Sequence, residues 1–208
     1  DGRTAVADAF ALVEKAWAGG ADVVLAPEWL FVPAHGPSLS AADKDVLLDR
    51  LAALTRGSER LLVPGTIPWH DDDDVVGGGY HNTAFALCDG RVVFAVDKRG
   101  DGDDVDIAKG MGRRHVADGG GSTFEWRGVT VGLEVCRDHG DARLRHELLA
   151  AGKRDVVDLQ LVVSSGVWLK HAAIGIGGMV LVAQGDGIAG HERGTRGDDG
   201  RLHVEPLS

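Results

Sequence analysis

Three side chains of this 208-residue sequence have the types that nucleophilic catalysis by cysteine requires: Glu28, Lys98 and Cys136. A cysteine attacks as a thiolate, so it needs a base that takes its proton or a cation that lowers its pKa. Glutamate can be that base. A lysine ammonium, supplemented by a backbone N–H, can stabilise the negative charge that develops on a carbonyl oxygen or a nitrile nitrogen.

Each of the three residues lies at the end of an apolar run that is typical of a buried strand. Glu28 follows "VVLAP", Lys98 follows "RVVFAVD", and Cys136 follows "VTVGLEV". Because strand ends form the rim at which layered α/β folds bind ligands, the three side chains could converge on one pocket. The alternative is structural, with a cysteine that packs in the core and a surface salt bridge between Glu28 and Lys98.

The elements that would position these residues follow one another along the whole chain. Residues 4–18 space their apolar side chains at helical intervals, and Ser40 with Asp43 resembles the capping box of a second helix. In the middle of the chain, two apolar-rich runs flank Asp89-Gly90, a dipeptide that favours a tight hairpin turn. Since helices and strands alternate around this hairpin, the order predicts one layered α/β domain over residues 1–208.

Further segments are predicted from local composition. Residues 99–122 are rich in Gly and Asp and lack periodicity, which indicates a functional loop or partial disorder. Residues 142–151 indicate a helix, and residues 167–178 a short helix weakened by its glycines. The tail predicts a hairpin that turns at Asp199-Gly200, and the acidic residues 70–79 predict a solvated loop rather than a metal site.

Composition limits the classes of partner. The formal net charge of −10 argues against binding to nucleic acid or to an anionic membrane, and a small uncharged or cationic ligand fits better. The two cysteines, Cys88 and Cys136, lack the paired spacings of zinc sites or disulfide frameworks, which favours a reducing, cytoplasmic location. Cys88 is interpreted as a small packing residue. No apolar run approaches the roughly 20 residues that a membrane-spanning helix needs.

Three short stretches resemble, in order and separation, the three motifs of the nitrilase superfamily of carbon–nitrogen hydrolases: "APEWLF", "VDKRG" and "GLEVCRDH". The resemblance runs from about residue 4 to residue 203. It implies an αββα sandwich that commonly dimerises and that needs no cofactor or metal. It also implies that Glu28 is the general base, that Lys98 stabilises the tetrahedral intermediate, and that Cys136 forms a thioester that water hydrolyses.

The sequence also departs from the pattern of the family. The strand expected before the first helix is absent, and Arg137 takes the place that often holds an aromatic residue. Arg137 could pair with a substrate carboxylate or be held by Asp138 or Asp141. His139 could act as an acid or base, although a loop histidine is usually solvated.

The second glutamate that many members carry after the lysine is missing too. Only aspartates occupy that region, and Asp104 and Asp106 are the candidates to replace it. Together with Arg137 and Ser165 they form the predicted set of substrate-binding residues.

Three functions remain open from the sequence. The leading one is hydrolysis of a small amide, carbamoyl compound or nitrile, and Arg137 favours an amide because nitrile-specific members tend to carry Trp at that position. The second is an acyl transferase that passes the same thioester to an amine or alcohol. The third is a non-catalytic binding protein on the same fold.

Overall fold

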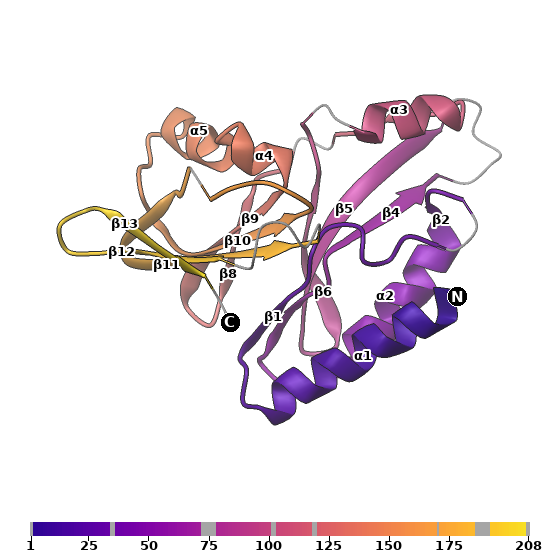
Figure 1. Ribbon diagram of the computed structural model, residues 1–208, viewed down its shortest axis with the longest axis horizontal. Helices are drawn as coiled ribbons and strands as arrows, with labels where there is room; N and C mark the ends of the chain where they lie inside the picture. Colours follow the sequence, from indigo (N-terminus) through magenta and orange to yellow (C-terminus); the bar gives the residue numbers. More distant parts are fainter. Residues whose placement is uncertain are drawn as a thin grey trace.

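The computed structural model describes residues 2–33, 36–71, 78–100, 103–117, 120–169, 171–185 and 192–206. Its strands form two sheets whose outer faces carry the helices (Figure 1). The helices are α1 (Gly2–Ala18), α2 (Ala41–Thr55), α3 (Asp103–Gly110), α4 (Arg137–Gly140) and α5 (Arg143–Ala150). Among the described residues, no helix has the length and apolar character needed to cross a membrane.

The first sheet is built around the long strand β5. Its path runs β1 (Val23–Leu25), β3 (Leu61–Val63), β5 (Gly79–Cys88), β4 (Thr66–His70) and β2 (Leu39–Ser40). Two more strands pair with β5, namely β6 (Arg91–Asp97) and β7 (Arg114–His115). Asp89 and Gly90 join β5 to β6 with φ of 49° and 76°, which confirms the predicted hairpin turn.

The second sheet contains the strand that ends at Cys136. Its order is β13 (Leu202–Pro206), β12 (Glu192–Arg196), β11 (Ile174–Gln184), β10 (Val157–Ser164), β9 (Val129–Val135) and β8 (Thr123–Trp126). The three central strands are parallel, with β10 between β9 and β11. Parallel strands place their carboxyl ends at one edge of the sheet, so the residues that follow β9 and β10 are neighbours.

The two sheets pack face to face over a shared apolar core. Strands β3, β5 and β6 of the first sheet and β9 and β10 of the second contribute its buried side chains, which are Leu61, Val63, Ala84, Ala86, Val96, Val131, Leu133, Val135, Leu161 and Val163. This arrangement confirms the predicted αββα sandwich. It also fixes the strand ends of one sheet opposite those of the other.

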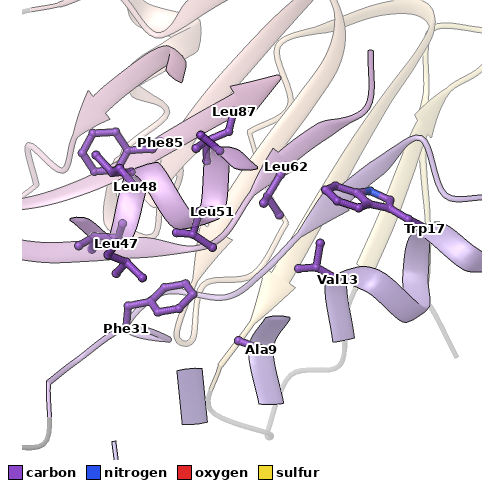
Figure 2. Packing of buried hydrophobic residues seen from close by; sticks show 12 residues of the cluster. Ala9, Val13, Trp17, Phe31, Leu47, Leu48, Leu51, Leu62, Phe85 and Leu87 are labelled. Carbon is purple, nitrogen blue, oxygen red and sulfur yellow. The ribbon is translucent and has the colours of Figure 1, made fainter. Parts of the chain in front are cut away.

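Helices α1 and α2 cover the outer face of the first sheet. Figure 2 shows Val13 and Trp17 of α1 near Leu51 of α2 and Leu62 of β3. The predicted cap of α2 is present, since Ser40 Oγ accepts a hydrogen bond from the Asp43 N–H at 3.1 Å. Helices α4 and α5 lie over the second sheet, where Leu144 and Leu148 join a cluster with β10 and β11.

Two of the predicted segments differ in the structure. Residues 99–122, predicted as a functional loop or a partly disordered segment, contain α3 and β7. Three aspartates in the first turn stabilise the amino end of α3. The helix predicted over residues 167–178 is wrong: residues 174–178 begin β11, which pairs with β10. Most of the acidic segment, residues 72–77, lies outside the described residues, as do residues 101–102 and 118–119.

Candidate active site

Cys136 connects β9 to α4 in an uncommon backbone conformation. Its φ and ψ are 44° and −104°, and its N–H donates to the carbonyl of Val163 on β10 at 2.7 Å. A positive φ is energetically costly for residues other than glycine, and residues in such conformations concentrate at functional sites. The surrounding sheet therefore holds a partly buried thiol at the carboxyl end of a central strand.

Glu28 is held by a second strained turn, just after β1. The next residue, Trp29, has φ of 66°, and its N–H donates to Thr66 Oγ1 at 3.1 Å. Gly65 also has positive φ, and a Cβ at this position would lie 2.1 Å from the carbonyl oxygen of Pro27. The close approach that only glycine allows brings the start of β4 against the Pro27-Glu28 segment.

The carboxylate of Glu28 is buried and accepts three hydrogen bonds. Lys98 Nζ at 2.7 Å and Asn82 Nδ2 at 3.0 Å both donate to Oε1, whereas Ser165 Oγ donates to Oε2 at 3.0 Å. A carboxylate has about four acceptor positions, two on each oxygen. Among the described residues, the free position is therefore on Oε2.

Lys98 lies between two buried carboxylates. Its Nζ is 2.7 Å from Glu28 Oε1 and 2.7 Å from Asp104 Oδ2. Burial by itself would lower the pKa of Lys98, but the negative charges of Glu28 and Asp104 raise it above its ordinary value. Tyr80 donates its hydroxyl to Asp104 Oδ1 at 3.3 Å. Lys98 is therefore an ammonium at neutral pH.

The surroundings of Cys136 shift the pKa of its thiol in opposite directions. Burial and the charge of Glu28 raise the pKa of Cys136, whereas the Ser165 N–H, the Lys98 ammonium and the Ser164 hydroxyl lower it. The pKa stays above the ordinary value of a thiol. A base is therefore required to form the thiolate at neutral pH.

The structure brings five of the predicted site residues together. Glu28, Lys98 and Asp104 form one ion-paired cluster, and Ser165 donates to Glu28. Cys136 is near enough for the charge of Glu28 to raise its pKa and that of Lys98 to lower it. Asp104 is fully buried, and its carboxylate is the one from α3 that lies against Lys98.

Two of the predicted substrate-binding residues lie apart from this cluster. The Asp106 side chain is 84% exposed and lies 3.5 Å from Lys109 on the outer face of α3. The Arg137 side chain is 59% exposed and lies 3.6 Å from Asp141, as one of the sequence alternatives expected.

The expectation that His139 is solvated is wrong. The side chain is fully buried, and its Nδ1 lies 2.8 Å from Glu134 Oε2. Glu134 also accepts hydrogen bonds from Gln160 Nε2 and from the Leu144 N–H. The imidazole thus belongs to a polar network that joins β9, β10, α4 and α5.

Among the described residues, no group of three or more His, Cys, Asp or Glu side chains could hold a metal ion.

Two residues that support the site, Asn82 and Asp138, were not assigned to it from the sequence. Asn82 is fully buried, and its Oδ1 accepts no hydrogen bond from the described residues. Asp138 accepts the N–H groups of Arg99 and Gly100 at 2.9 and 2.7 Å, which ties α4 to the chain just after Lys98. Asn82 is a polar residue within the apolar strand "HNTAFALC", and that signal could have found it.

Comparison with known proteins gives a result for the fold but not for the sequence. No protein-family model matches the chain, and no curated protein matches it. Among solved structures, a cysteine-to-alanine mutant of the Nesterenkonia AN1 amidase from the nitrilase superfamily is similar, with a TM-score of 0.67 and 18% identity over 100% of this chain and 82% of that one. The chain has the same fold as this amidase.

Two other structures are similar to this chain. One is a glutamate-to-glutamine mutant of the same amidase that shows the result of Michael addition of acrylamide at the active-site cysteine, with a TM-score of 0.66 and 18% identity over 100% of this chain and 88% of that one. The other is a glutamine-dependent NAD+ synthetase from Acinetobacter baumannii, with a TM-score of 0.64 and 14% identity, of which the match covers 41%. Nitrilase-fold units therefore occur both alone and within longer chains.

Proposed function

We propose that this protein is a thiol amidase that hydrolyses a small amide or carbamoyl compound through a thioester on Cys136. The observation that carries the proposal is the buried Glu28–Lys98 pair, 2.7 Å between Oε1 and Nζ, which acts electrostatically on the Cys136 thiol at the strand ends. The mutant amidase whose active-site cysteine has added acrylamide supports a nucleophilic cysteine on the same fold. The proposal covers the whole chain as one catalytic domain, since both sheets share one core.

In the first step, Glu28 takes the proton of Cys136. Oε1 already accepts hydrogen bonds from Lys98 and Asn82, so Oε2 is the oxygen that receives the proton. The thiolate then attacks the carbonyl carbon of the amide and forms a carbon–sulfur bond. The electron pair of the carbonyl moves to its oxygen.

In the second step, Lys98 stabilises the oxyanion of the tetrahedral intermediate. Its ammonium is buried and held in place by Glu28 and Asp104, so little reorganisation is needed as charge develops. Glu28 returns the proton to the departing nitrogen, the carbon–nitrogen bond breaks, and ammonia or an amine leaves. Water activated by Glu28 then attacks the thioester and frees Cys136.

Release of ammonia from a panel of small primary amides, carbamoyl compounds and nitriles tests the proposal. We expect turnover of at least one amide or carbamoyl compound, loss of turnover in Cys136→Ala, and retention in Cys88→Ala, which removes the other thiol of the chain. Turnover in Cys136→Ala comparable to that of the unmodified protein would exclude the proposed nucleophile.

A further inference from the structure

Ser164 lies at the carboxyl end of β10, directly beside the nucleophile. Val163 of β10 pairs with Val135 of β9, so the residues that follow them, Ser164 and Cys136, are neighbours across parallel strands. Ser164 is fully buried. Its carbonyl accepts the N–H of Glu28 at 3.2 Å, which links this strand end to the segment that carries the base.

The hydroxyl of Ser164 has its acceptor capacity filled. Its Oγ accepts the N–H groups of Gly166 at 3.0 Å and Val167 at 2.8 Å, where the chain turns away from β10. A serine hydroxyl has one proton and two acceptor positions. Both acceptor positions are occupied, so Ser164 can take part in a further hydrogen bond only as a donor.

The atom that receives this proton is the sulfur of Cys136. The distance from Ser164 Oγ to Cys136 Sγ is 3.7 Å, as expected for a hydrogen bond to sulfur. Because two backbone N–H groups fix the oxygen, the hydroxyl is not a free rotor that could turn away. We propose that Ser164 is a catalytic residue whose only proton is directed at the nucleophile and stabilises the Cys136 thiolate.

This inference rests on the proposed role of Cys136 as nucleophile. It means that both Ser164 and its neighbour Ser165 act on the nucleophile. The Ser165 N–H acts on the same sulfur, and Ser165 Oγ donates to Glu28 Oε2 at 3.0 Å. One dipeptide thus contacts both nucleophile and base. A hydrogen bond to a thiol is weak, but it becomes charge-assisted once Glu28 has taken the proton. Its gain therefore falls on the state that attacks the substrate.

The rate at which iodoacetamide alkylates Cys136, measured against pH by peptide mass spectrometry, tests the role of Ser164 without any substrate. Cys88 in the same chain is the internal reference. In Ser164→Ala, we expect alkylation of Cys136 at neutral pH to fall about tenfold or more, since a hydrogen bond to a charged group is roughly twice as strong as one between neutral groups. At pH values where the thiol is fully ionised in both proteins, the two rates should converge.

A pair of variants at position 164 and one control variant separate thiolate stabilisation from a loss of structure. Ser164→Thr keeps the donor and Ser164→Val removes it at nearly the same shape, so only the valine variant should show the slow alkylation if alanine does not fold. Ser38→Ala is the control, because it removes another buried serine hydroxyl, one that lies 2.8 Å from His70 Nδ1, and its alkylation profile should follow that of the unmodified protein.

Coincident profiles for Ser164→Ala and the unmodified protein would overturn the inference. A rate that changes by the same factor at every pH would also overturn it, because that pattern reports access to the sulfur rather than its ionisation. Ammonia release is measured on the same samples. If the unmodified protein turns over no amide but shows the Ser164-dependent alkylation profile, the proposed amidase activity is wrong. The proposed stabilisation of the thiolate by Ser164 is then still supported.

Discussion

At the residue scale, the central feature is a lysine placed between two buried carboxylates. Breaking such a cluster leaves a buried charge without its partner, so each member matters both to the fold and to the chemistry. Glu28 and Asp104 are not equivalent, however. Glu28 has a free acceptor position on Oε2, whereas Asp104 accepts from Tyr80 and faces Lys98. We therefore assign proton transfer to Glu28 and the positioning of Lys98 to Asp104.

The two aspartates of α3 provide a matched test of this assignment. Asp104→Asn should lower kcat for an amide about tenfold or more, because Lys98 loses one of the two charges that fix its ammonium. Asp106→Asn should leave kcat near that of the unmodified protein, because this side chain lies 84% exposed on the other face of α3. Equal losses in both variants, measured by ammonia release, would contradict the assignment.

The candidate nucleophile, base and cation could be predicted from the sequence because each follows a recognisable apolar run. Their partners could not. Asn82, Thr66 and Ser164 act through side chains that meet the site only after β5, β4 and β10 have taken their places. A single sequence does not determine which strand ends lie opposite each other across two sheets.

At the scale of elements, turns were easier to predict than the structure of glycine-rich segments. The dipeptide Asp89-Gly90 has a strong local preference, and it decides its turn alone. Helix α3 was missed because its eight residues are too short for a clear apolar period. The glycines at the start of β11 disfavour helix and strand alike, and pairing with β10 decides the outcome.

The turn that carries Glu28 predicts a strong effect for one glycine. Gly65→Ala should abolish most amide turnover, because the new Cβ would lie 2.1 Å from the Pro27 carbonyl oxygen and push the Glu28 segment away. Gly57→Ala is the control: it also has positive φ, 67°, but its Cβ would meet nothing within 4 Å. This control should lose about 1–2 kcal/mol of unfolding free energy and keep its turnover. Full turnover in Gly65→Ala would refute the role given to the close approach.

The Asp138 carboxylate, which binds the N–H groups of Arg99 and Gly100, forms a clamp between α4 and the chain after Lys98. This clamp predicts a similar contrast. Asp138 is buried and accepts two backbone N–H groups, whereas Asp141 is half exposed. An asparagine at position 138 has a single acceptor oxygen, so one N–H would lose its partner. Asp138→Asn should therefore lower kcat more than KM changes, and Asp141→Asn should alter neither greatly. Unchanged kinetics in Asp138→Asn would show that the clamp does not position Lys98.

At the scale of the whole molecule, alternating helices and strands predict the layers, and the resemblance in three motifs predicts the αββα order. The shared core between the sheets explains why strand ends from both halves of the chain meet. Low identity to the similar structures, 18% for the amidase mutants, leaves the fold as what they have in common with this chain. The function therefore has to be inferred from the residues of the site rather than from these similar structures.

The buried ion pairs predict how the stability of the molecule depends on pH. The pKa of Lys98 is raised in the folded state, so its contribution is fully present below the unfolded pKa of about 10.4 and is lost as pH rises through the folded pKa. Lys98→Met should cost about 3–5 kcal/mol of unfolding free energy at pH 7, and this deficit should shrink in strongly alkaline solution. Lys109→Met, at a largely exposed ion pair, is the control and should cost about 0–1 kcal/mol. A deficit that grows at alkaline pH, in urea unfolding, would contradict the account.

The most direct test of the central claim is where fluoroacetamide attaches to the unmodified protein. Attack by the sulfur forms a carbon–sulfur bond, expels fluoride and leaves one acetamide group on the cysteine, with the thiol proton passing to Glu28. Peptide mass spectrometry over time is expected to show that group on Cys136 well before it appears on Cys88, and Glu28→Gln is expected to slow the reaction at Cys136 alone. Equal labelling of the two cysteines, or no dependence on Glu28, would contradict the claim that Cys136 is a nucleophile activated by Glu28.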